Sequence, residues 1–174
     1  FKKILLSCLI LVSNSTFAKS LALSFDDGLD LVTHPQAQHI NDAILNTLKQ
    51  NNVHAIIYPS LSKIGANEGL GMIKQWGEQG HRIGNHGNLH LNLNKDEVNL
   101  STYLADMQQG HQAFSTLQGF VPRYRFPFLK EGNTLEKRDG VRQWIKDHHY
   151  QSGAVSIDAS DWFYNQLFLK YQLE

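Results

Sequence analysis

The chain has 174 residues, of which 41% are hydrophobic, and this is enough for one domain with a sizeable core. Its 16 basic and 16 acidic side chains give a formal net charge of zero and are scattered along the chain. No basic patch of the kind that binds nucleic acid results, so the sequence argues against nucleic acid and favours a neutral or weakly charged partner.

Residues 1–18 have the composition of a secretory signal peptide. Two lysines precede an apolar run over residues 4–12, which is too short to cross a membrane, and polar and small residues then lead to Ala18. We predict cleavage after Ala18, export to the periplasm or the extracellular space, and a mature chain, residues 19–174, with no transmembrane segment. The only cysteine, Cys8, lies inside the apolar run, which argues against the alternative of a lipoprotein signal.

Strand and helix patterns alternate along the rest of the chain. Short apolar runs predict strands at residues 21–25, 53–58, 81–86, 121–128 and 153–157. Helical spacing of apolar residues predicts helices at residues 36–51, 70–79, 95–117 and 135–149, with a last helix near the end. Such alternation indicates βαβ units and a parallel sheet, either open or closed into a barrel.

Polar side chains gather at the predicted carboxyl ends of these strands. In chain order they are Asp26, Asp27, His86, Arg125, Asp158 and Asp161. Because the carboxyl ends of parallel strands share one edge of the sheet, we expect these side chains to form one site.

Asp26 and Asp27 are neighbouring carboxylates directly after a buried run. Neighbouring carboxylates repel each other and lose hydration together, so such a pair indicates a cation or a proton-transfer role. The alternative is a solvated turn, since Asp and the following Gly28 are common turn residues.

His86 and His90 are four residues apart, so one helical turn would direct both rings at one point. The chain has nine histidines, so the spacing alone is weak evidence, and hydrogen-bonded loop histidines are the alternative. Together with a strand-end carboxylate the pair predicts a site for Zn²⁺ or another divalent first-row metal. Asp27 is the predicted third ligand, which leaves Asp26 as general base, and we expect Arg125 and the cation to keep Asp26 ionised.

Four segments, in this order, resemble the motifs of the polysaccharide deacetylases, carbohydrate esterase family four. They are Ser-Phe-Asp-Asp-Gly at 24–28, His-Gly-Asn-Leu-His at 86–90, Arg-Phe-Pro-Phe at 125–128 and Asp-Ala-Ser-Asp-Trp at 158–162. The family removes N-acetyl or O-acetyl groups from sugars. The resemblance implies an α/β fold of parallel strands, a distorted (β/α) barrel with fewer than eight repeats.

The resemblance also implies roles for individual residues. Asp26 is the catalytic base, Arg125 orients it, and Asp27, His86 and His90 bind a divalent metal, Zn²⁺ with Co²⁺, Mn²⁺ or Ni²⁺ as alternatives. The implied substrate is an acetylated amino-sugar polymer or oligosaccharide, and the predicted export suggests that it belongs to the cell envelope.

Three further residues receive roles from the same resemblance. Phe128 offers its backbone N–H to the oxyanion, and Trp162 lines the pocket for the acetyl methyl group, with ordinary core packing as its alternative. Asp161 is a catalytic residue that pairs with a late histidine.

The sequence departs from the family pattern in three places. Gly87 stands where the family has Ser or Thr, Phe126 stands where Pro is common, and no Leu-x-x-His follows His149. That last motif supplies the general acid. We therefore expect residues 19–174 to be a catalytic domain that is incomplete at its C-terminus, lacks the last strand and helix, and has low activity. Arg123, on the same predicted strand face as Arg125, is a rival for the orienting role.

Three other functions remain open at this level. An amidase or cyclic imidase would act on a small substrate without releasing acetate from sugars. A non-haem iron oxygenase would depend on dioxygen and would leave Asp26 without a task. A non-catalytic carbohydrate-binding barrel would bind metal and sugar without turnover.

Overall fold

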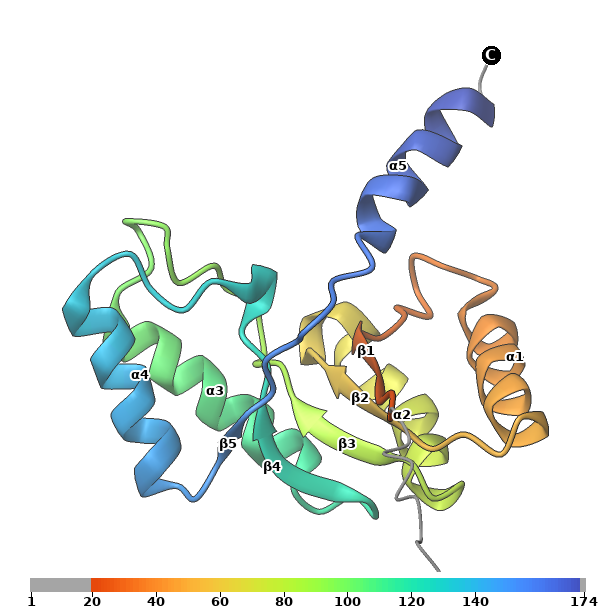
Figure 1. Cartoon of the computed structure of the whole chain (residues 1–174), viewed down its shortest axis with the longest axis horizontal. Helices are drawn as coiled ribbons and strands as arrows, with labels where there is room; N and C mark the ends of the chain where they lie inside the picture. Colours follow the sequence, from red (N-terminus) through yellow and green to blue (C-terminus); the bar gives the residue numbers. More distant parts are fainter. Residues whose placement is uncertain (1–19, 173–174) are drawn as a thin grey trace, which may run out of the picture.

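A computed structural model of the chain describes residues 20–172. The predicted signal peptide, residues 1–18, lies outside them. Five parallel strands alternate with helices (Figure 1). The elements are β1 (Leu23–Asp27), α1 (Ala37–Gln50), β2 (Ala55–Pro59), α2 (Leu70–Glu78), β3 (Arg82–Asn85), α3 (Leu100–Phe114), β4 (Phe120–Tyr124), α4 (Leu135–Asp147), β5 (Gln151–Ser152) and α5 (Asp161–Gln172), with short 3₁₀ turns η1 (Leu61–Ile64), η2 (Ala66–Gly69) and η3 (Pro127–Leu129).

The strands lie side by side in chain order, β1-β2-β3-β4-β5, and every neighbouring pair is parallel. Parallel neighbours are joined by right-handed crossovers, which place successive helices on the same face of the sheet. This order is that of a (β/α) barrel. In the part of the chain that the structure describes, β1 and β5 form the two edges of an open sheet. The predicted α/β fold of parallel strands is confirmed.

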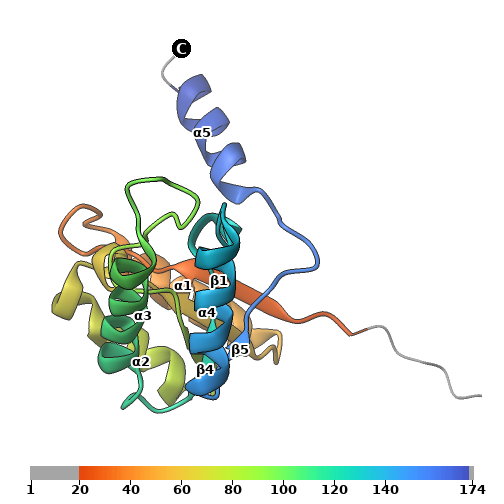
Figure 2. The same cartoon turned by 90° about the vertical axis from the view of Figure 1, so that its left-hand side faces the viewer.

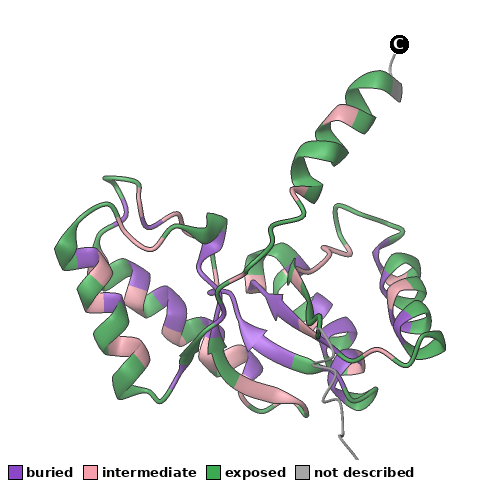
Figure 3. Cartoon of the chain, viewed as in Figure 1, coloured by how far each residue is buried: buried purple, intermediate pink, exposed green. Residues whose placement is uncertain are grey.

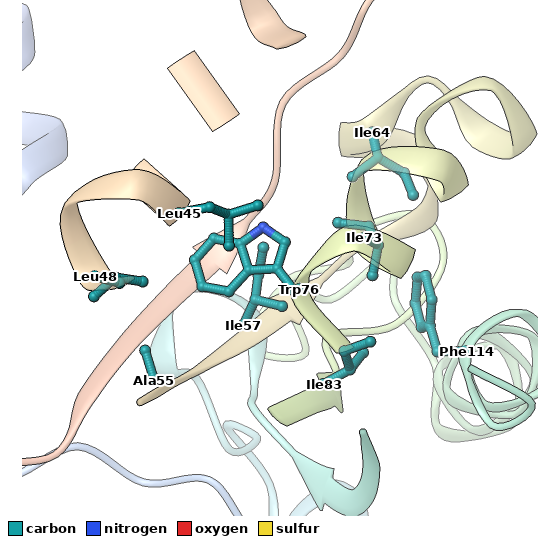
Figure 4. Packing of buried hydrophobic residues seen from close by; sticks show 9 residues of the cluster. All are labelled: Leu45, Leu48, Ala55, Ile57, Ile64, Ile73, Trp76, Ile83 and Phe114. Atoms are coloured by element: carbon teal, nitrogen blue, oxygen red, sulfur yellow. The ribbon is translucent and has the colours of Figure 1, made fainter. Parts of the chain in front are cut away.

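The helices cover one face of the sheet through an apolar cluster around Trp76 (Figure 4). Trp76, Leu45 and Ile57 are each no more than 3% exposed. Phe25 packs edge-on against Trp76, with 5.2 Å between ring centroids. The indole N–H donates to Asn41 Oδ1 at 2.8 Å, so the one polar group of Trp76 is satisfied. A second cluster joins α3, α4 and β4 and consists of Leu93, Val98, Tyr103, Met107, Tyr124, Phe126, Val141 and Tyr150.

Side-chain alternation along β1 decides what the other face of the sheet carries. Because Phe25 packs against the helices, its neighbours Ser24 and Asp26 point to the opposite face. Arg125 lies on that face as well: its Nη2 donates to Ser24 Oγ at 3.1 Å, and its guanidinium lies 4.4 Å from the centroid of the Tyr58 ring. Figure 2 shows the sheet from its side, with β1 and β5 away from α2 and α3. The face without helices therefore carries Asp26 and Arg125.

The helix predicted to start at residue 95 begins at Leu100 instead. Asn99 caps it, because its side chain accepts a hydrogen bond from the N–H of Thr102 at 2.9 Å. Residues before this cap form a loop. The apolar spacing of the helix was predicted correctly, but the cap residue sets its start.

Two predicted strands are shorter in the structure. The fourth ends at Tyr124, because the chain turns at Pro127, which has no N–H to donate to a sheet. The fifth strand was predicted at residues 153–157, but the structure has it earlier and shorter, at Gln151–Ser152, which pair with Arg123 and Tyr124. The carbonyl oxygen of Tyr124 still accepts the N–H of Gly153 at 2.7 Å, but β4 ends at Tyr124 and the ladder goes no further. The strand predicted at residues 153–157 is therefore wrong.

The last helix, α5, extends away from the sheet, and most of its surface is exposed (Figures 1 and 3). Trp162, Tyr164 and Phe168 are each about 60% exposed. Within residues 20–172, no helix combines the length and the apolar character needed to cross a membrane.

Candidate active site

The carboxyl ends of β1, β3 and β4 bring the predicted polar residues together. Asp26 and Asp27 are the last residues of β1, His86 follows β3, and Arg125 follows β4. His90 reaches the same place from the loop after β3. Of the six residues expected at the strand ends, the structure brings together Asp26, Asp27, His86 and Arg125, and His90 joins them.

Asp27, His86 and His90 form a group that could hold a metal ion, with one ligand atom of each within 4.8 Å of the others. Asp27 Oδ1 lies 3.0 Å from His90 Nε2 and 3.5 Å from His86 Nε2. The same Oδ1 is buried and has no hydrogen-bond partner among the described residues. A buried carboxylate oxygen without a donor is costly unless a cation satisfies it, so these residues fit a divalent metal.

Protonation favours the metal-binding form of this group. The Nδ1–H of His86 donates to the carbonyl oxygen of Arg125 at 2.7 Å, which leaves Nε2 free on the side of Asp27. Burial lowers the pKa of His86 to about 4, so its ring is neutral at pH 7. Burial acts to raise the pKa of Asp27, but the two imidazoles beside it, His90 above all, outweigh burial and lower that pKa below its usual value.

Arg125, which follows β4, holds Asp26 at the end of β1. Its Nη1 donates to both carboxylate oxygens of Asp26, at 2.8 and 2.9 Å, and its Nε donates to the carbonyl oxygen of Gly153. Burial raises the pKa of Asp26 and outweighs the opposite effect of Arg125. Arg125 therefore lowers the pKa of Asp26, as predicted, but burial has the larger effect. The sequence could not reveal how far Asp26 is buried.

Arg123 does not compete for this role. Its Nε donates to Gln151 Oε1 at 3.1 Å, and its side chain is exposed. Of these two arginines, Arg125 is the one that contacts Asp26.

The histidine pair lies on an irregular loop, and the predicted helical turn is wrong. Gly87 has a φ of 82° and His90 a φ of 55°, both in the left-handed region. Asn85 shapes the start of the loop, because its Oδ1 accepts the N–H of Gly87 at 2.8 Å. Asp106 of α3 accepts the next two N–H groups of the loop. Sequence reasoning missed Asn85 and Asp106, although a carboxylate on the apolar side of a predicted helix is a detectable signal.

Phe128 lies beside the candidate metal ligands. It is the middle residue of η3, has a φ of 57° and is 56% exposed. Its ring centroid is 4.5 Å from that of His90. The side chain of Phe128 thus lies against the His90 ring, and the role of its backbone N–H stays a prediction.

Asp161 and Trp162 begin α5. Asp161 is near enough for its charge to raise the pKa of Asp26. Trp162 is 60% exposed, and its ring packs against Phe163 at 5.9 Å between centroids. Within the described residues no aromatic contact joins Trp162 to the metal-ligand group, so its role in an acetyl pocket stays a prediction.

Replacement of Arg125 by Met is expected to lower the free energy of unfolding by about 2 kcal/mol. Breaking a buried ion pair costs about 3–5 kcal/mol, and the smaller value follows because the Asp26 side chain keeps 35% of its exposure. Arg123→Met is the matched control two residues earlier, with an expected change below about 0.5 kcal/mol. Urea unfolding measures both variants, and equal losses would contradict the assigned contact.

Comparison with known proteins agrees with this geometry. The family model described as polysaccharide deacetylase matches residues 13–151. A peptidoglycan-N-acetylglucosamine deacetylase of Bacillus cereus is 32% identical over 143 residues, which cover 82% of this chain and 46% of that protein. The chain thus spans about half of this relative's length.

Solved structures have the same fold. The Bc1960 peptidoglycan N-acetylglucosamine deacetylase has a TM-score of 0.59 at 27% identity, over 75% of this chain and 54% of that one. A family 4 carbohydrate esterase from Streptomyces lividans, solved with acetate, has a TM-score of 0.63 at 18% identity, over 82% of this chain and 65% of that one. With a family model that matches most of its length and a site built on the strand ends, the chain belongs to the polysaccharide deacetylase family.

Proposed function

We propose that this protein is a metal-dependent deacetylase that removes acetyl groups from the amino sugars of an envelope polysaccharide. The observation that carries the proposal is the buried, unpartnered Oδ1 of Asp27 between two imidazoles, directly beside the Asp26–Arg125 pair. The printed function of the Bacillus cereus relative, deacetylation of peptidoglycan N-acetylglucosamine, supports this choice of substrate.

Asp27, His86 and His90 would hold the ion, and Zn²⁺ suits two imidazoles and one carboxylate. When bound, such an ion acts as a Lewis acid that polarises the acetyl carbonyl and lowers the pKa of water. His86 is prepared for this task because its proton stays on Nδ1, held by the Arg125 carbonyl oxygen. No side chain has to move to offer Nε2.

Asp26 is the proposed general base. Arg125 fixes both carboxylate oxygens in place, and a raised pKa makes Asp26 a better proton acceptor than an ordinary exposed aspartate. The proton of the attacking water passes to Asp26 as the water oxygen bonds to the acetyl carbon.

The remaining residues are proposed to bind and orient the substrate. The backbone N–H of Phe128 donates to the developing oxyanion, and Trp162 covers the acetyl methyl group. Asp161 would pair with the histidine of a Leu-x-x-His motif, which residues 150–174 do not contain, and that histidine would protonate the leaving amine. We further propose that residues 1–18 direct export, which would bring the protein to its polysaccharide.

The purified protein, loaded with Zn²⁺, is expected to release acetate and free amine in equal amounts from N-acetylglucosamine oligomers, at a low rate because residues 150–174 contain no histidine to act as general acid. A chelator should abolish the release and added metal should restore it. Acetate without new amine would indicate O-deacetylation. Hydrolysis of small amides or cyclic imides without acetate from sugars would indicate the amidase alternative, and binding of oligomer and metal without turnover the non-catalytic barrel.

A further inference from the structure

The loop of residues 86–90 is held between two elements that bear no metal-ligand candidates. Helix α3 lies on one side of the loop, and the 3₁₀ turn η1 lies on the other. The loop matters because it carries both histidines of the candidate metal group. The groups that fix this loop therefore decide where the two imidazoles stand.

Asp106 of α3 supplies the contacts on the first side. Its Oδ2 accepts the N–H of Asn88 at 3.0 Å, and its Oδ1 accepts the N–H of Leu89 at 2.7 Å. The Asp106 residue is only 3% exposed. One buried carboxylate thus satisfies two consecutive N–H groups immediately before His90.

The turn η1 and Ser60, which precedes it, bind the loop on the second side. The carbonyl oxygen of Asn88 accepts the N–H of Ser62 at 2.8 Å and the hydroxyl of Ser60 at 2.9 Å. The peptide groups around Asn88 are therefore bonded in both directions. Strained backbone persists where the surroundings fix it in this way.

Strain is present at the residue that follows. His90 has a φ of 55°, which a residue with a Cβ adopts rarely. Its Nε2 comes within 3.0 Å of Asp27 Oδ1 in this conformation. Without the bonds to Asp106, the loop could relax at His90 and move its ring away from Asp27.

The fit between Asp106 and the loop leaves no spare room. A Cβ added at Gly87 would lie 2.3 Å from Asp106 Oδ2, and one added at Gly110 would lie 2.3 Å from Asn85 Oδ1. Gly87, which departs from the usual residue of the family, is thus the residue that lets the carboxylate approach.

We propose that Asp106 is the positioning residue that places His90 for metal binding, through the N–H groups of Asn88 and Leu89. The inference rests on the proposed metal site and adds a residue outside the four sequence motifs. Asp106 does not touch the metal ligands' rings; it fixes the backbone that carries one of them.

The test is a titration of the metal-free protein with Co²⁺, followed by visible absorption. We expect Asp106→Asn to bind Co²⁺ about 10–100-fold more weakly than the wild type, as is usual when a group that supports a metal ligand is lost. The absorption of bound Co²⁺ should also change in shape, because the imidazole of His90 is displaced. The variant keeps one acceptor but turns an N–H₂ group toward one of the two loop N–H groups.

Leu48→Ala is the control that distinguishes a general loss of stability from a specific effect of Asp106 on metal binding. Leu48 lies on α1 in the apolar cluster around Trp76 and is 6% exposed. This variant should lower the unfolding temperature but leave Co²⁺ affinity and spectrum unchanged. If Asp106→Asn does not fold at the assay temperature, Asp106→Glu replaces it. The longer side chain keeps the carboxylate but must push the loop outward, so weaker Co²⁺ binding is again expected.

The outcomes distinguish the two proposals. A folded wild type that binds no Co²⁺ would contradict the metal site itself. A wild type that binds Co²⁺, together with a folded Asp106 variant of equal affinity and equal spectrum, would overturn the role of Asp106 and leave the metal site standing. Weaker binding in both the Asp106 variant and Leu48→Ala would also overturn it.

Discussion

Replacement of Asp26 by Asn is expected to lower kcat for acetate release by about 10²–10⁴-fold, the usual contribution of a general base. Asn has the same shape and keeps an oxygen that can accept from Arg125, but it cannot take up a proton from water at neutral pH. Asp26 lies outside the group of three metal-ligand candidates, so Zn²⁺ affinity should stay the same. Steady-state kinetics on N-acetylglucosamine oligomers and a metal titration together measure the effect.

Asp42→Asn is the matched control for this prediction. Asp42 is an exposed aspartate of α1 whose carboxylate accepts a hydrogen bond from Gln38, and its loss should leave kcat unchanged. Two results would contradict the assigned role of Asp26. Full activity of Asp26→Asn would remove it from proton transfer, and a simultaneous loss of Zn²⁺ would make it a metal ligand.

The strand-end part of the site could be predicted because it depends on local pattern. Alternation along β1 turns Phe25 toward the helices and Asp26 toward the open face, and this follows from the sequence of one strand. Parallel strands then place His86 and Arg125 at the same edge. The order of the strands along the chain and the two-residue alternation of side chains within a strand were sufficient to predict these positions.

The histidine loop could not be predicted in the same way. A spacing of four residues fits a helical turn, but the loop takes left-handed φ values at Gly87 and His90 because Asp106 binds its N–H groups. These hydrogen bonds join Asp106 to residues 18 and 17 positions earlier, so no short sequence motif contains both partners. Asp106 lies among the buried residues of α3 with Tyr103 and Met107. A charged residue on the apolar side of a helix was the only sign in the sequence that it has a special role.

The extent of β4 and β5 was also beyond local pattern. Residues 153–157 are apolar enough for a strand, but a strand needs a neighbour, and β4 ends at Tyr124. The pKa of Asp26 also depends on distant segments. Burial by other elements raises this pKa more than Arg125, the partner expected from the sequence, lowers it. Properties that rest on contacts between distant segments were those that the sequence predicted poorly.

Asp27→Asn is expected to lower Zn²⁺ affinity by at least about 100-fold, since loss of a group that only supports a ligand already costs 10–100-fold. Deacetylation should be lost with the metal, as it should after chelation of the wild type. Asn is the suitable replacement because Asp27 has a φ of 69°, a conformation that Asn tolerates better than Ala does.

Unfolding of the two proteins with and without metal separates a binding site from a structural ion pair. At a free Zn²⁺ concentration 100 times its Kd, the wild type should gain about 2.7 kcal/mol of unfolding free energy, whereas Asp27→Asn should gain almost none. Without metal, the variant should be as stable as the wild type within about 1 kcal/mol, because the Asp27 side chain is 40% exposed and a partly exposed ion pair with an imidazole contributes little. Suppose instead that the variant loses several kcal/mol without metal and the wild type gains nothing from Zn²⁺. Asp27 would then hold His86 and His90 as a structural partner, and the deacetylase chemistry proposed for this site would have no metal to depend on.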